Sequence, residues 1–306
     1  MRNIFAETLY KCAIKNKDIY IVAADISPAG SMETFRKNYP DRFINVGVAE
    51  QVMIGVTAGL AMRKKRPFAY TIATFALYRP FEMIRDDLCY QNLPVTIVGM
   101  GGGTIYSTLG GTHLTQEDIS IARSIPNMSI IAPCDPNELR EAVNYLAFKS
   151  TGPTYLRIGK SGEKNFTDEK TEKWKFGKIR KVAEGKDICI LTFGPIIKIA
   201  FQLREHFIKN GNKLAIFSFH TLKPINYGEL KKIMKDFSKI VVIEDHSEIG
   251  GLSSIVKSYA SENKYKGKIQ NFSLKDKFFH KYGSHDNLLE LHGISFNQIA
   301  KNKIFN

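Results

Sequence analysis

The chain has 306 residues, of which 43% are hydrophobic and 24% are charged, and these proportions are typical of a globular protein with room for two domains. Its formal net charge is +14, but the lysines are dispersed and form no recognisable nucleic-acid module, so we predict no nucleic-acid partner. The cysteines lack C-x-x-C or metal-ligand spacing, which argues against a disulfide framework and a zinc site. They are Cys12, Cys89, Cys134 and Cys189.

The first 18 residues carry a charge every few positions and contain no continuous apolar stretch, which predicts an amphipathic helix rather than a signal peptide. No segment approaches the roughly 18 consecutive apolar residues of a membrane span. Together with the scattered cysteines, these features predict a protein of the reducing cytoplasm that does not bind membranes.

Short β-rich runs alternate with helical segments through the first half of the chain. The predicted strands are 19–25, 67–72, 94–101, 128–133 and 154–159. The predicted helices are 49–63, 75–92, 116–124 and 136–149, the last with Asp135 as its N-cap and Pro136 at its first position. This alternation predicts an α/β domain over residues 1–162, with a doubly wound, mostly parallel sheet.

The segment 163–186 is polar, rich in lysine and poor in periodic apolar residues, so we predict a linker there. A smaller α/β alternation follows, which predicts a second domain over residues 187–306. Its predicted strands are 187–194, 213–220 and 239–245, and its predicted helices are 196–209, 226–236 and 250–262.

Glu50 lies in the middle of an apolar segment, 45–61, whose sequence is NVGVAEQVMIGVTAGLA. A charged group in apolar surroundings costs several kcal/mol unless it is paired, hydrogen-bonded or neutralised by a raised pKa. Glu50 is therefore either a structural glutamate in the first turn of a helix or a residue whose acid form has a chemical role.

Aromatic residues recur at a spacing of three after the strand 67–72. Phe75, Tyr78 and Phe81 lie along one side of the start of the predicted helix, with Arg79 among them. Such a stripe is consistent with core packing and also with stacking against a flat heteroaromatic cofactor. The pattern alone leaves both interpretations open.

A glycine-rich loop follows the strand 94–101 and leads to His113, just before a predicted helix. Its glycines allow positive φ angles and close approach of a ligand to the backbone. Ligands of α/β proteins bind at the carboxyl ends of parallel strands. His113 is therefore a candidate catalytic residue, although a structural role is equally consistent with its position.

Several segments together resemble the transketolase family of thiamine diphosphate enzymes. They are DRFINVGVAEQ, TFALYRPFEMIRDD, GGTHLTQEDISIARSIPNMSIIAPCDPNE, GPTYLRIGK and VVIEDHSEIGGLSS, in the order in which they occur. The chain resembles the C-terminal section of that family nearly from end to end. The resemblance implies a pyrimidine-binding α/β domain followed by the smaller transketolase C-terminal domain.

The resemblance also implies roles for individual residues. In the family, the glutamate of the GxxEQ segment bonds N1′ of the cofactor's aminopyrimidine, and it corresponds to Glu50. Its protonated form favours the 4′-imino tautomer that deprotonates the thiazolium C2. For this role we expect Glu50 to be buried at a subunit interface, and to be protonated and within hydrogen-bonding reach of N1′, rather than of any arginine or lysine, when the cofactor is bound. Phe75 and Tyr78 correspond to the aromatics that stack on the pyrimidine, with Phe81 behind them.

His113 corresponds to a histidine that lies near the reacting carbon and relays protons or binds substrate oxygens. Arg157 corresponds to an arginine that binds a substrate phosphate or carboxylate. Two positions depart from the family pattern, because Gly101 and Leu109 stand where a histidine and an aspartate are usual. Both of the usual residues bind sugar hydroxyls, so Leu109 is expected to favour a substrate that lacks one.

The family's GDG motif for diphosphate and metal does not occur in this sequence. The resemblance therefore implies a separate N-terminal, diphosphate-binding subunit that holds most of the Mg²⁺ or Ca²⁺ contacts, in an α2β2 complex. It implies ketol transfer between phosphorylated or nucleotide-linked sugars, and no metal ligands in this chain. The alternatives are the β subunit of a 2-oxo acid dehydrogenase E1 component, a deoxyxylulose-phosphate-synthase-like acyl transferase, and a non-catalytic scaffold.

Overall fold

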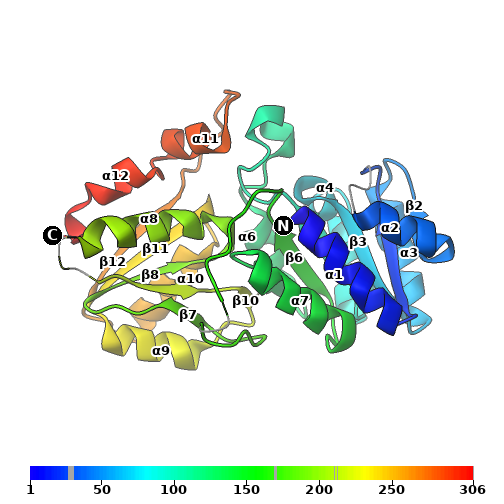
Figure 1. The fold of residues 1–306 in the computed structure, drawn as a ribbon, viewed down its shortest axis with the longest axis horizontal. Coiled ribbons are helices and arrows are strands. Elements are labelled where there is room, and N and C mark those ends of the chain that lie inside the picture. The colour runs from blue at the N-terminus through cyan, green and yellow to red at the C-terminus, as the bar shows by residue number, and fades with distance from the viewer. Residues whose placement is uncertain (27–30, 169–170, 210, 212, 306) are drawn as a thin grey trace.

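The computed structural model describes residues 1–26, 31–168, 171–209, 211 and 213–305. The chain forms two α/β units that lie side by side (Figure 1). In this view the N-terminal unit, coloured blue to green, is at the right, and the C-terminal unit, coloured yellow-green to red, is at the left. The predicted fold class is confirmed.

The N-terminal unit is built on a seven-stranded sheet in the order β10-β5-β6-β4-β3-β1-β2. All neighbouring pairs are parallel except β10 with β5. The strands are β1 (Ile19–Ala23), β2 (Phe43–Asn45), β3 (Arg66–Ile72), β4 (Thr96–Met100), β5 (Ser129–Ile131), β6 (Thr154–Ile158) and β10 (Thr221–Lys223).

Helices cover both faces of this sheet, because successive strand residues point to opposite sides. Ile21 belongs to the core formed with α1, α2 and α7, whereas Val22 belongs to the core formed with α3, α6 and η2. The helical segments are α1 (Arg2–Lys15), α2 (Ser31–Asn38), η1 (Pro40–Arg42), α3 (Glu50–Met62), α4 (Ala73–Leu77), α5 (Phe81–Met83), η2 (Ile84–Tyr90), η3 (Ser107–Leu109), η4 (Gly111–His113), α6 (Asp118–Ser124) and α7 (Pro136–Phe148).

The prediction of one helix over 75–92 is wrong. The helix α4 ends at Leu77, and Pro80 precedes the short α5, after which η2 continues as a π-helical segment. Proline lacks an N–H group and its ring clashes with the preceding turn, which accounts for the break. Tyr78 caps α4 with helical backbone angles, and Arg79 and Pro80 form the turn that follows it.

The C-terminal unit contains a five-stranded sheet in the order β12-β11-β8-β9-β7, parallel except for β7 with β9. Its strands are β7 (Arg180–Ala183), β8 (Ile188–Thr192), β9 (Ala215–Ser218), β11 (Lys239–Ser247) and β12 (Lys268–Leu274). Its helical segments are η5 (Gly194–Ile196), α8 (Ile197–Ile208), α9 (Tyr227–Asp236), α10 (Leu252–Glu262), α11 (His285–His292), α12 (Phe296–Ala300) and η6 (Lys303–Phe305).

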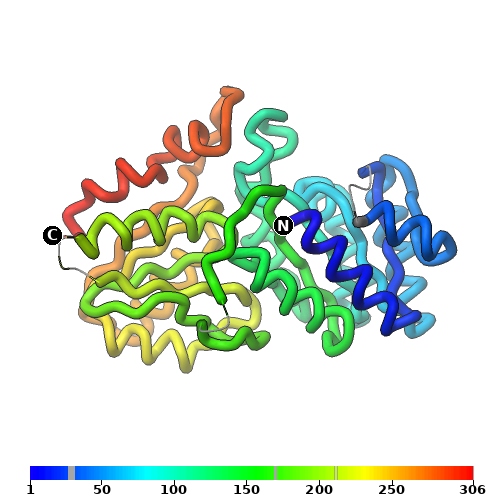
Figure 2. Tube along the Cα trace, viewed as in Figure 1, coloured from blue at the N-terminus to red at the C-terminus, as the bar shows by residue number. Residues whose placement is uncertain are grey.

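The two units are joined more closely than the predicted linker implies. Figure 2 shows the green segment after β6 passing across the front of the molecule between the units. Within the predicted linker, β7 already belongs to the second sheet, and β10 from the predicted second domain pairs with β5 of the first sheet. The C-terminal unit therefore contributes a strand to the sheet that carries the candidate site.

Each helix that the structure describes is too short or too polar to cross a lipid bilayer. The four cysteines are buried and form no disulfide bond.

Candidate active site

The candidate site residues follow strands whose carboxyl ends meet at one edge of the first sheet. Glu50 comes after β2, Phe75 after β3 and His113 after β4. Because β1 lies between β2 and β3, the direction of winding reverses there, and open α/β sheets bind ligands at such a point. The fold thus brings three separate segments to a ligand-binding edge.

Glu50 is the first residue of α3 and is only 3% exposed. Its carboxylate is bound by the guanidinium of Arg79, whose Nη1 donates to Oε1 at 3.1 Å and to Oε2 at 2.9 Å. In this chain alone Glu50 is thus paired with an arginine, whereas the expectation that it bonds N1′ instead concerns the cofactor-bound protein and stays a prediction. The ion pair removes the cost of burying a lone carboxylate.

Phe75 lies at the centre of the site, in α4. The Arg79 guanidinium carbon lies 4.2 Å from the centre of the Phe75 ring. On another side of Phe75, the His113 ring packs edge-on with a centroid separation of 5.2 Å. His113 Nδ1 is 2.9 Å from the Thr112 hydroxyl. Glu50, Arg79, Phe75 and His113 thus form one continuous cluster.

Tyr78 is held away from this cluster by Glu117, because its hydroxyl donates to Glu117 Oε2 at 2.8 Å. Burial and the carboxylates of Asp118 and Glu117 raise the pKa of Tyr78 above its ordinary value, so the phenol stays protonated. Phe81 packs against the core on the α3 side of the sheet. The predicted stacking role therefore has its best geometric support at Phe75.

The glycine-rich loop before His113 is closed at its base and held by the C-terminal unit. Thr115 N donates to Gly103 O at 2.9 Å, and Gly103 N donates to the Thr115 hydroxyl at 2.8 Å. The backbone N–H and hydroxyl of Thr104 donate to Asp245 of β11 at 2.8–3.2 Å. His285 Nε2 lies 3.0 Å from the same carboxylate.

The two positions that depart from the family pattern occupy different surroundings. Gly101 has a φ of +73°, and a Cβ atom there would overlap the ring of Tyr106. Tyr106 thus fills the space that a side chain at position 101 would need. Leu109 lies at the tip of the loop and is 47% exposed.

Arg157 is buried, at 3% exposure, and does not face an open site. Its Nε donates to Asp118 Oδ2 at 2.8 Å, and its Nη2 donates to the backbone oxygen of Asp245 at 2.8 Å. Although burial opposes the charged form, the carboxylates of Asp118 and Asp245 raise the pKa of the guanidinium. In this structure Arg157 therefore joins the two units, and its predicted role in binding a substrate phosphate or carboxylate stays a prediction.

Lys160 is a candidate residue that the sequence analysis missed. It lies two residues beyond β6, and its Nζ is 5.0 Å from the centre of the Tyr106 ring, which in turn packs against His113. Lys160 also lines a cavity of about 650 Å³ together with Ser161 and His285. Its position just after the end of a parallel strand is the signal that could have identified it.

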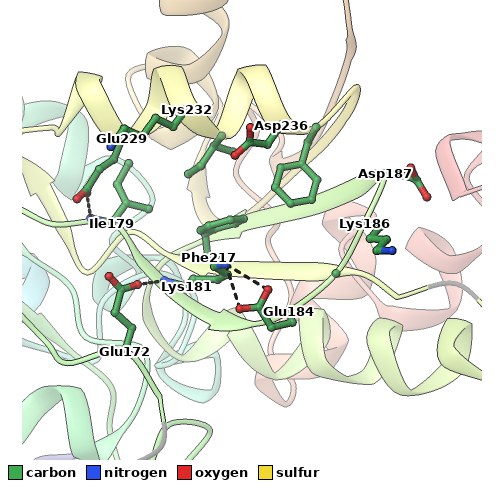
Figure 3. A pocket seen from close by; sticks show the side chains of 13 residues that line it. Glu172, Ile179, Lys181, Glu184, Lys186, Asp187, Phe217, Glu229, Lys232 and Asp236 are labelled. Carbon is green, nitrogen blue, oxygen red and sulfur yellow. Dashed lines mark hydrogen bonds and ion pairs between the residues drawn. The ribbon is translucent and has the colours of Figure 1, made fainter.

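A second cavity, of about 600 Å³, lies on the C-terminal unit beside β7 and α9 (Figure 3). Several of its charged side chains bind one another. Lys181 Nζ is 3.0 Å from Glu184 Oε1, and the Lys181 backbone N–H donates to Glu172. None of the predicted site residues lines this cavity, so we treat it as separate from the candidate active site.

Comparison with known proteins places both units in named families. The chain matches "Transketolase, pyrimidine binding domain" over residues 1–162 and "Transketolase, C-terminal domain" over residues 177–299. It is 35% identical to "Putative transketolase C-terminal section" of Methanocaldococcus jannaschii, with 98% of this chain and 94% of that protein aligned. It is 31% identical to a subunit of the apulose-4-phosphate transketolase of Phocaeicola vulgatus, with 86% and 84% aligned.

A solved structure described as "Split gene transketolase, inactive beta4 tetramer" has the same fold. It matches 98% of this chain and 95% of its own with a TM-score of 0.87 and 32% identity. The similarity therefore covers both units and their arrangement along the chain.

Proposed function

Because the chain belongs to the transketolase family and corresponds to its C-terminal section, we propose that it is the pyrimidine-binding subunit of a split, thiamine diphosphate-dependent transketolase. The proposed reaction is transfer of a two-carbon ketol unit between sugars. The observation that carries the proposal is the buried carboxylate of Glu50, joined through Arg79 to the face of Phe75 at the ligand-binding edge of the sheet.

Glu50 and Phe75 fit the aminopyrimidine half of thiamine diphosphate. The guanidinium of Arg79 is flat, lies over the Phe75 ring and binds the Glu50 carboxylate. The space beside Glu50 and Phe75 therefore accepts a planar, delocalised group with N–H donors. The sequence lacks a GDG motif, so we assign the diphosphate and its Mg²⁺ or Ca²⁺ mainly to a separate N-terminal subunit in an α2β2 complex.

Thiamine diphosphate, when bound, supplies a nucleophilic thiazolium carbon. In the proposed mechanism, Glu50 holds a proton at N1′ of the aminopyrimidine, and its burial keeps water from competing for that position. Phe75 orients the pyrimidine by stacking. His113, which packs on the edge of Phe75, exchanges protons with substrate oxygens.

We propose phosphorylated or nucleotide-linked sugars as substrates. Lys160 lies near His113 through Tyr106 and is a second candidate for the anion-binding role that was predicted for Arg157. The apolar and exposed Leu109 is suited to a sugar that lacks a hydroxyl at the matching carbon. We place the protein in the cytoplasm, where its buried thiols remain reduced.

The rival functions are less well supported. Relatives of the chain's own length carry transketolase names, which favours this function over a deoxyxylulose-phosphate-synthase-like acyl transferase. A dehydrogenase E1 β subunit would also use Glu50 and Phe75, and it would differ in its oxo-acid substrate. A non-catalytic scaffold does not require the cluster of Glu50, Phe75 and His113.

The test is hydrogen/deuterium exchange at C2 of thiamine diphosphate in the complex with the partner subunit. We expect Glu50→Gln to slow the exchange by ~10² to 10⁴ at saturating cofactor, because an amide has almost no acidity. The control is Glu82→Gln, at an exposed glutamate between α4 and η2. Equally fast exchange in wild type and Glu50→Gln would show that Glu50 is only structural.

A further inference from the structure

Arg79 makes the two contacts that the proposed function assigns to the cofactor's aminopyrimidine. Its guanidinium lies over Phe75 with the carbon 4.2 Å from the ring centre. Its Nη1 donates to both oxygens of Glu50. A protonated or imino pyrimidine and a guanidinium share the features that such a site recognises, namely a flat delocalised system and N–H groups that face a carboxylate.

Arg79 is held only on the side that faces the site. Its side chain remains 44% exposed, whereas that of Glu50 is 4% exposed. The structure describes no other hydrogen bond or ion pair of the Arg79 guanidinium within the residues it covers. It also lies outside regular helix, between α4 and Pro80. The Arg79 side chain can therefore turn into solvent once its hydrogen bonds to Glu50 break.

We propose that Arg79 is a resident substitute for the aminopyrimidine, which occupies the pyrimidine position in the free subunit and is displaced when thiamine diphosphate binds. This inference rests on the proposed function. Arg79 keeps a flat group with N–H donors against Glu50 and Phe75, so the pyrimidine position stays shaped for the cofactor in the free subunit. It also lowers the apparent affinity, because only the fraction of molecules with Arg79 displaced can bind.

The experiment compares thiamine diphosphate binding, with Mg²⁺, to the complex of this chain with its diphosphate-binding partner, for wild type and Arg79→Ala. Titration calorimetry gives the affinity and stopped-flow mixing gives the rates. We expect the variant to bind about fivefold more tightly, which is ~1 kcal/mol, the size of an ion pair with one exposed partner. The gain in affinity should appear in the association rate, because no molecule of the variant has the pyrimidine position occupied by an arginine.

Two further variants make the result specific. Arg79→Lys keeps the charge but not the flat, forked guanidinium, so it should bind with an intermediate affinity; it also serves if Arg79→Ala does not fold. Arg85→Ala removes an exposed arginine that binds only Asp86 in the described structure, and it should match wild type.

Equal or weaker binding by both Arg79 variants would overturn the inference, and so would a gain confined to the dissociation rate. A wild-type complex that binds no thiamine diphosphate would instead overturn the proposed function. The two failures are therefore distinguishable in one set of titrations.

Discussion

Glu50 and Asp118 are both almost completely buried carboxylates of the N-terminal unit that are bound by an arginine, but the two pairs differ in what surrounds them. Glu50 binds Arg79, whose side chain is largely open to solvent at the edge of the sheet. Asp118 binds Arg157, and both side chains are enclosed where the two units meet. The same chemical pair is therefore found both at a surface open to solvent and in the interior.

The enclosed pair is tied to further groups by hydrogen bonds. Asp118 Oδ2 also accepts the Tyr155 hydroxyl at 2.8 Å, and Arg157 donates to the backbone of Asp245. His246 Nε2 accepts the N–H groups of Ile119 and Ser120 at the start of α6. By contrast, Arg79 can leave Glu50 without disturbing another bond. The Glu50–Arg79 pair therefore suits a binding site, and the Asp118–Arg157 pair suits the structural junction between the two units.

The largest expected effect is at the enclosed pair. Arg157→Met should lower the free energy of unfolding by about 3–5 kcal/mol, because it leaves the Asp118 carboxylate buried without its cation. Urea unfolding of the purified chain measures this change. The double variant Asp118→Asn/Arg157→Met should recover part of the loss, since neither charge is then left alone. A small loss in Arg157→Met would show that the junction does not depend on this pair.

Replacing Asp245 is expected to have a smaller effect on the free energy of unfolding. Its carboxylate accepts hydrogen bonds from Thr104 and so holds the loop that leads to His113. Burial alone would raise the pKa of Asp245, but the hydrogen bond and charge of His285, with Arg157 and Thr104, lower it to about 2. Since the folded pKa lies below the ordinary value of 3.8, the stabilisation is present above about pH 4 and is lost as the pH falls towards 2.

This lowered pKa corresponds to roughly 2 kcal/mol in the free energy of unfolding. Asp245→Asn should therefore be less stable than wild type at pH 5, and the difference should shrink by about that amount near pH 2. Unfolding curves at the two pH values provide the measurement, with the exposed Asp276→Asn as control. A constant difference between wild type and Asp245→Asn at both values would mean that this carboxylate does not titrate as the geometry indicates.

The features that could be predicted from the sequence are those set by local patterns. Asp135 caps α7 as expected, accepting the Glu138 N–H at 2.8 Å, because capping involves residues three positions apart. The burial of Glu50 likewise follows from its apolar neighbours. Short strands such as β10 and β12 were missed, because three residues, or a polar segment such as KIQNFSL, give no clear alternation.

The arginine partners could not be predicted from local patterns. Arg79 lies 29 positions from Glu50, and Asp118 lies 39 positions before Arg157. Arg79 lies four residues after Phe75, a spacing that places two side chains on one face of a helix, and its guanidinium lies over the Phe75 ring. The burial of Arg157 was not anticipated, because its strand does end at the ligand-binding edge, while the C-terminal unit that covers it is distant in the sequence.

The smallest expected effect on the free energy of unfolding is at the solvent-exposed pair of Glu50 and Arg79. Arg79→Ala should lower the free energy of unfolding of the isolated chain by only about 0.5–1 kcal/mol, because water already screens the guanidinium and can solvate the Glu50 carboxylate once the arginine is gone. The same substitution at Arg157 provides the matched control, and it should cost several times more. Urea unfolding of both variants in parallel gives the ratio directly. Equal losses would contradict the distinction between the two pairs, because Arg79 would then be as much a part of the framework as Arg157 and could not give way to a cofactor.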